Sequence, residues 1–208
     1  MSALLKLSGW IDALNERVGR YVSWLILAAV LISAFNAVIR KAFNYSSNAF
    51  LEIQWYLFAA VFLLAAGYTL LRHEHVRIDI ILSRFSKRTQ IIIEAICTVL
   101  FLFPFGITVI ELVWPLVVKA YVSGEMSNNA GGLIRWPVFL MMPLGFSLLL
   151  LQGWSELIKR LAYLQGLIED PTFKKVAKTA EEELAEEIAR LAEEKDKAAK
   201  AAANGGQA

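Results

Sequence analysis

The chain has 208 residues, of which 57% are hydrophobic, and its formal net charge is only +2. Soluble domains are about 45–50% apolar, so this excess indicates that much of the chain faces a second apolar solvent, the lipid bilayer. The small net charge gives no sign of a nucleic-acid partner, and the single cysteine, Cys97, excludes an internal disulfide framework and offers no metal-ligand spacing.

The first twenty residues, 1–20, are predicted to form an amphipathic helix. Apolar side chains recur there at three- and four-residue steps, at Leu4, Leu7, Ile11, Leu14 and Val18, and charged residues fill other positions. We expect this helix to lie on the inner leaflet of a membrane ahead of the first span, or to pack against the cytoplasmic face of a partner. The periodicity fits both placements.

Four long apolar stretches follow, at residues 21–39, 53–71, 91–118 and 136–157. The first two carry no charged residue, the third carries only two glutamates, and the fourth is uncharged as far as Ser155. About 20 apolar residues cross a hydrocarbon core of roughly 30 Å. Backbone groups in lipid must be hydrogen-bonded within their own segment, so we predict helices rather than strands. The predicted fold class is an all-α integral membrane protein with a four-helix membrane domain at 21–158.

We predict different structures for the second and third loops between the spans. In the second loop, Asp79 is placed to cap a short helix at the membrane interface, with an apolar face formed by Ile80, Ile81 and Phe85. The third loop, 119–135, is rich in glycine and asparagine. We predict that it is an irregular outer connector.

The distribution of basic residues predicts the orientation of the chain. Lysine and arginine are more frequent in the N-terminal segment, the second loop and the C-terminal segment than in the first and third loops. The positive-inside rule therefore places both termini in the cytoplasm, as an even number of spans requires. The tail at 159–208 is then cytoplasmic, with a charged helix at about 179–200 whose acidic start and basic end suit the helix dipole.

Ionisable residues within the spans are the first candidates for function. Glu94 and Glu111 are 17 residues apart, which is about 25 Å along a helix and on different faces, so they do not form a paired site. We favour a structural role for both near opposite interfaces over proton coupling. His73 and His75 lie outside the spans, and the sequence has no metal-ligand cluster and no catalytic motif. The sequence therefore predicts neither an enzyme nor a cofactor site.

Other residues indicate how the helices pack. Arg40 and Glu52 flank the first loop, where they are expected to pair across the tops of the first two spans. A predicted packing face of small residues follows the first span at four-residue steps, at Ala29, Ser33 and Ala37. Pro104 is expected to kink the third span.

Several short motifs resemble those of one transporter family. They are residues 36–40 (Asn-Ala-Val-Ile-Arg), 51–55 (Leu-Glu-Ile-Gln-Trp), 74–79 (Glu-His-Val-Arg-Ile-Asp), the Ser127 to Pro137 stretch and 143–146 (Pro-Leu-Gly-Phe). Over roughly residues 1–165 the chain resembles the small permease subunit, DctQ-like, of tripartite ATP-independent periplasmic (TRAP) transporters. The resemblance implies a structural or subunit-interface role for six residues, Arg40, Glu52, Trp55, Gly67, His75 and Asp79.

The resemblance also implies the partners of the chain. In such systems a periplasmic binding protein captures the solute, and a large multi-span permease carries the substrate and sodium sites. The small subunit packs against that permease in the bacterial inner membrane and needs no cofactor of its own. The form of residues 53–60 is similar to that of systems for small organic acids, such as keto or hydroxy acids.

Two other functions stay open from the residues alone. The anchor subunit of a respiratory enzyme would be expected to carry histidines within its spans. A stand-alone small exporter would be expected to carry an acidic residue at the bilayer centre, where the third span has Pro104.

Overall fold

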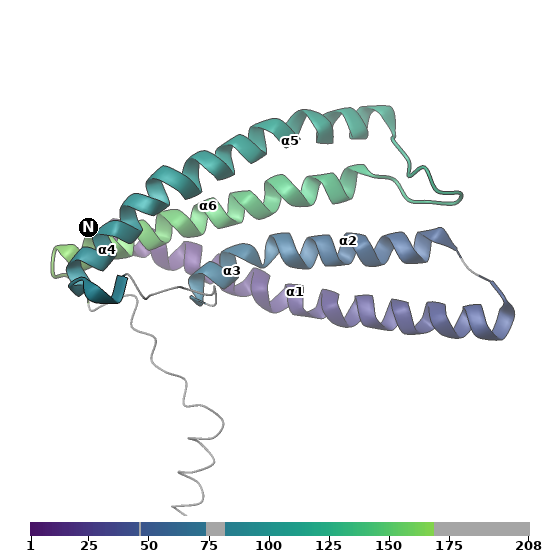
Figure 1. Ribbon diagram of the computed structural model, residues 1–208, viewed down its shortest axis with the longest axis horizontal. Coiled ribbons are helices and arrows are strands. Elements are labelled where there is room, and N and C mark those ends of the chain that lie inside the picture. Colours follow the sequence, from purple (N-terminus) through teal and green to yellow (C-terminus); the bar gives the residue numbers. More distant parts are fainter. Residues whose placement is uncertain (46, 74–81, 169–208) are drawn as a thin grey trace, which may run out of the picture. The chain divides into compact units, whose positions relative to one another are not determined.

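The computed structural model describes residues 1–45, 47–73 and 82–168 (Figure 1). Within these residues the regular structure is helical, apart from one isolated bridge between Met126 and Ile134. The elements are α1 (Ser2–Phe43), α2 (Asn48–Leu64), α3 (Ala66–Leu71), the 3₁₀ turn η1 (Leu82–Arg84), α4 (Lys87–Cys97), the π-helical turn η2 (Thr98–Leu102), α5 (Phe103–Ser123) and α6 (Trp136–Leu164). Four predicted features lie outside the described residues: His75, Asp79, most of the short helix that Asp79 would cap, and the tail helix at 179–200.

Four helical segments are long and apolar enough to cross a bilayer: Ser2–Phe43, Asn48–Leu71, Lys87–Ser123 and Trp136–Leu164. They confirm the predicted number of spans and the all-helical class. The second segment joins α2 to α3 through Ala65, and the third joins α4, η2 and α5. These segments extend beyond the predicted apolar stretches because helical hydrogen bonding continues into the flanking polar residues.

The first helix differs from the prediction at its start. We expected a separate helix at 1–20, but α1 runs without a break from Ser2 to Phe43. The predicted apolar face is only partly covered: Leu4, Leu7 and Leu14 are 43–52% exposed, Val18 is half-buried and Ile11 is buried. The polar residues Ser8 and Asn15 are buried beside Ile11. The position of this segment relative to the bilayer surface stays a prediction.

A repeat of seven residues marks the buried side of α1. The buried positions Ser8, Asn15, Val22, Ala29 and Asn36 follow one another at steps of seven. A seven-residue period keeps one stripe of a helix against its neighbours with a slight left-handed supercoil. Of the predicted small-residue face, Ala29 is buried on this stripe, Ser33 is half-buried and Ala37 is exposed.

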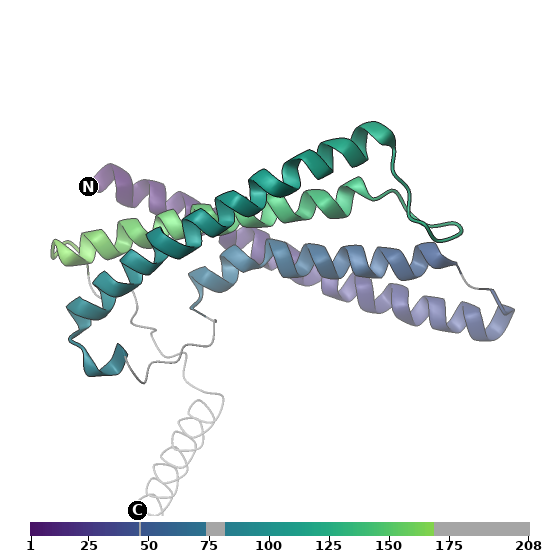
Figure 2. The same cartoon turned by 45° about the horizontal axis from the view of Figure 1, so that its top comes forward.

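Helix α6 is the central element of the described bundle, since it contacts α1, α2, α3, α4 and α5. Both views show α2 beside α1 and α5 beside α6 (Figures 1 and 2). We call the end with the start of α1 and the end of α6 the terminal end, and the end with the first and third loops the loop end (Figure 1). At Gly145 of α6, an added Cβ would lie only 2.5 Å from the carbonyl oxygen of Leu63, so the absent side chain lets α6 approach the backbone of α2.

The third membrane segment changes its geometry next to a proline. It starts after Ser86, whose hydroxyl accepts a hydrogen bond of 3.4 Å from the Thr89 amide. The π-helical turn η2 ends at Leu102, two residues before Pro104. A proline has no N–H to donate and crowds the preceding turn, so a wider turn at this point relieves the clash. This is the position at which the sequence predicts a kink.

Candidate functional site

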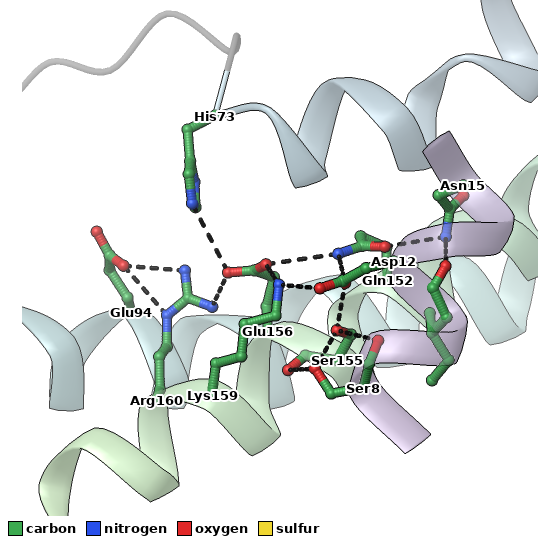
Figure 3. Close-up of polar contacts among 11 residues, drawn as sticks. Ser8, Asp12, Asn15, His73, Glu94, Gln152, Ser155, Glu156, Lys159 and Arg160 are labelled. Atoms are coloured by element: carbon green, nitrogen blue, oxygen red, sulfur yellow. Dashed lines mark hydrogen bonds and ion pairs between the residues drawn. The ribbon is translucent and has the colours of Figure 1, made fainter. Parts of the chain in front are cut away.

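Polar side chains from three helices meet at the terminal end of the bundle (Figure 3). We call this group the terminal-end cluster. It consists of Ser8, Asp12 and Asn15 of α1, His73 after α3, Glu94 of α4, and Gln152, Ser155, Glu156, Lys159 and Arg160 of α6.

One half of the terminal-end cluster joins α1 to α6 through hydrogen bonds. Asp12 Oδ1 accepts from the Ser155 hydroxyl at 2.6 Å and from Gln152 Nε2 at 2.9 Å. Asn15 Nδ2 donates to Gln152 Oε1 at 2.9 Å, and the hydroxyls of Ser8 and Ser155 lie 2.7 Å apart. Lipid offers no hydrogen-bond partners, so polar faces of this kind are buried against each other.

The other half of the terminal-end cluster is ionic. Arg160 is 3% exposed and lies between two carboxylates, with Nη1 3.0 Å from Glu156 Oε2 and Nη2 3.0 Å from Glu94 Oε2. His73 Nε2 lies 3.9 Å from the same Glu156 oxygen (Figure 3). The guanidinium therefore ties α4 to α6, because its fork of donors can serve two acceptors at once.

Lys159 connects the two halves of the cluster. Its ammonium lies 2.9 Å from Asp12 Oδ2 and 2.7 Å from Glu156 Oε1. Each of the three carboxylates in the cluster thus faces a cation. Among the residues that the structure describes, no group of three or more His, Cys, Asp or Glu side chains is arranged to hold a metal ion. The arrangement is suited to fixing helices against one another.

The two intramembrane glutamates occupy different surroundings. Glu94 belongs to the terminal-end cluster through Arg160. Glu111 is exposed on α5 and takes no part in that cluster.

A second polar group lies at the loop end, centred on Glu52, which is 3% exposed. Its carboxylate accepts hydrogen bonds from the Ser127 hydroxyl, from Asn129 Nδ2 at 2.8 Å and from the Leu133 amide at 2.7 Å. We call this arrangement the Glu52 clamp. The predicted pairing of Glu52 with Arg40 is wrong, because the carboxylate turns toward the third loop and Arg40 stays exposed. A carboxylate with three donors around it has little to gain from an exposed cation.

Further contacts hold the third loop to α2. Asn48 Nδ2 donates to the carbonyl of Ala130 at 2.9 Å, and the Tyr56 hydroxyl donates to the carbonyl of Ile134 at 3.1 Å. Trp55, on the same helix, is 63% exposed and takes no part in these contacts. The predicted irregular connector is therefore fastened to α2 at several points.

Gly67 lies where three helices approach closely. A Cβ at this position would collide with the amide oxygen of Asn15 and would lie 3.0 Å from the carbonyl oxygen of Leu148. Any side chain larger than hydrogen would push α3 away from α1 and α6.

The Glu52 clamp contains Glu52, Ser127 and Leu133 from the motifs that resemble a known family, and a family comparison agrees. The family model for tripartite ATP-independent periplasmic transporters, DctQ component, matches residues 29–162. The chain belongs to this family. Neither a curated protein nor a solved structure matches the chain. The DctQ family is a transporter component family, so this chain is a small membrane subunit of a TRAP transporter.

Sequence reasoning missed most of the terminal-end cluster. It did not single out Gln152, Ser155, Glu156 or Arg160 of α6. Their spacing of three to four residues places them on one side of the helix. A glutamine inside an otherwise apolar span, followed by an i, i+4 pair of glutamate and arginine, is the signal that indicates a polar packing face.

Proposed function

We propose that this DctQ-family subunit supports the large TRAP permease during sodium-coupled uptake of a small organic acid delivered by a periplasmic binding protein. In this proposal the permease carries the substrate and sodium sites, and the chain itself binds lipid and the permease but no cofactor and no nucleic acid. It lies in the bacterial inner membrane with both termini in the cytoplasm, as the distribution of lysine and arginine favours.

The proposal that this chain supports the permease rests on one observation. The polar groups of the described helices are largely used in holding the chain together. The terminal-end cluster pairs its carboxylates with its own cations, and the Glu52 clamp uses its carboxylate on a loop. The outward surfaces of the helices are rich in exposed apolar side chains. A transport path would instead need polar groups turned toward a water-filled cavity.

The proposal is tested by purification and reconstitution. The chain is purified from its native membranes in mild detergent, and we expect a multi-span TRAP permease to be recovered in equal amount. Liposomes that contain both subunits, with the binding protein and an inward sodium gradient, should take up an organic acid, whereas either subunit alone should not. Uptake or export by this chain alone would favour the stand-alone exporter, and a haem absorption band would favour the respiratory anchor.

Glu111 offers a test of where sodium coupling resides. Glu111→Gln removes a charge from the exposed face of α5, so the dependence of uptake on sodium concentration should be unchanged in the reconstituted transporter. An altered sodium stoichiometry would contradict the placement of all sodium sites on the permease.

A further inference from the structure

An open polar groove lies between α1 and α2 at the loop end. It has a volume of about 540 Å³, and its walls include Ser33, Asn36, Ala37 and Arg40 of α1 with Leu51 and Gln54 of α2. The groove therefore combines small, amide and cationic side chains in a part of the chain that belongs to membrane-spanning helices.

Asn36 is the buried residue among those that line this groove. It is 7% exposed, and its Oδ1 has no hydrogen-bond partner among the described residues. A buried amide oxygen without a partner is costly, more so where the surrounding solvent is hydrocarbon. Asn36 is also the last position of the seven-residue packing stripe, so the stripe ends in an amide that lacks a partner.

The two cations beside Asn36 also lack a counter-ion. Arg40 and Lys41 are exposed, and neither forms a salt bridge within the described residues. Two carboxylates of the loop end are already engaged, since Glu52 holds the third loop and Glu125 pairs with Arg135 at 2.8 Å. The mouth of the groove is therefore positive.

Small residues leave room for a close approach along this wall. Ser33 and Ala37 are one helical turn apart and both line the groove. Such a pair lets the backbone of another helix come near, and this is how helices commonly associate in lipid.

We propose that a transmembrane helix of the large permease subunit packs into this groove, donating a hydrogen bond to Asn36 and placing a carboxylate against Arg40 and Lys41. The inference rests on the proposed function, in which the permease is the partner. A lipid is a poorer occupant, because its headgroup can reach Arg40 while its acyl chain offers nothing to Asn36. A second copy of this chain, related by a two-fold axis, would bring the same cations face to face.

A photocrosslinking amino acid identifies the occupant. Benzoylphenylalanine is placed at Leu51, a large residue that lines the groove and is 42% exposed, and separately at Val38, which is 62% exposed and does not line it. In membranes that contain the complete transporter, we expect crosslinks to the permease from position 51 and several-fold fewer from position 38. A crosslinked dimer of this chain, a lipid adduct alone, or equal crosslinking from both positions would overturn the proposal.

Substitutions measure the contribution of the groove to assembly. Ala37→Phe fills it and should lower the recovery of permease on the order of tenfold, by steric overpacking. Asn36→Leu removes the amide and should lower recovery about threefold, as expected for one hydrogen bond between membrane helices. Val38→Phe is the control and should leave recovery unchanged. Because Ala37 is exposed in the chain by itself, Ala37→Phe should not alter the melting temperature of the purified chain.

The results separate this inference from the proposed function. If the unmodified chain recovers no permease, the proposed function fails. If it does recover permease and Ala37→Phe recovers as much, the proposed function stands and the groove is not the docking site.

Discussion

At the scale of single residues, Glu52 fixes a loop that has little regular structure of its own. The third loop contains one isolated bridge, and three of its donors converge on the Glu52 carboxylate. A carboxylate accepts hydrogen bonds only, so each of its oxygens suits a loop that presents N–H and O–H groups. The loop conformation at the loop end thus depends on one side chain of α2.

Glu52→Gln should loosen the third loop. One oxygen becomes an NH₂ group, which faces a donor and can no longer accept. We expect a lower apparent melting temperature in detergent and faster hydrogen exchange at the Leu133 amide. Glu125→Gln, which affects a partly exposed ion pair on the same loop, is the control and should change both little. Unchanged exchange at Leu133 in the Glu52 variant would show that the clamp does not hold the loop.

Gly67→Ala should destabilise the bundle by about 1–3 kcal/mol, because the new methyl group enters the space of Asn15 and Leu148. The matched control is Gly9→Ala on α1, where an added Cβ meets nothing within 4 Å. That change should be neutral, or stabilise by roughly 0.5–1 kcal/mol through helix propensity. Thermal unfolding of the unmodified chain and of the two purified variants tests this prediction. Equal melting temperatures would contradict the close approach at Gly67.

At the scale of helices, the sequence predicts the elements better than their contacts. Hydropathy locates four spans because the length of an apolar stretch is a local property. The polar part of the buried side of α1 was not predicted, because in lipid polar residues such as Ser8 and Asn15 are buried while Leu4 faces outward. Glu52 and Glu94 were named as candidates, but their partners lie more than sixty residues away on other elements, and helix periodicity carries no information on that pairing.

Arg160→Met should weaken the attachment of α4 to α6. The change leaves two carboxylates, Glu94 and Glu156, without the guanidinium that lies between them, at a cost on the order of 3 kcal/mol. Arg72→Met is the matched control, since Arg72 pairs with Glu16 and both side chains are partly exposed, which limits the loss to about 1 kcal/mol. Thermal unfolding in detergent compares the two variants. A smaller loss for Arg160 than for Arg72 would show that the buried network contributes little.

At the scale of the whole described bundle, the two polar groups lie at opposite ends and the apolar surface lies between them. The terminal-end cluster joins α1, α4 and α6, and the Glu52 clamp joins α2 to the third loop. Because α5 packs chiefly on α6, much of its apolar surface is left for lipid or the permease. This division suits a subunit that is stabilised at its ends and contacts other components along its sides.

The orientation of the chain follows from charge, and reporter fusions can test it. The terminal end carries more basic residues, among them Lys6, Arg17, Arg20, Arg72, Lys87, Arg88, Lys159 and Arg160, than the loop end, which has Arg40, Lys41, Lys119 and Arg135. The positive-inside rule therefore predicts that the terminal end is cytoplasmic. Alkaline phosphatase fused after Gly124, at the loop end, should be active, because it folds only in the periplasm. Green fluorescent protein fused after Gly166 should fluoresce, because it matures in the cytoplasm. The opposite pattern would show that the chain has the inverse orientation. The Glu52 clamp and the α1–α2 groove would then lie on the cytoplasmic side, out of reach of the periplasmic binding protein.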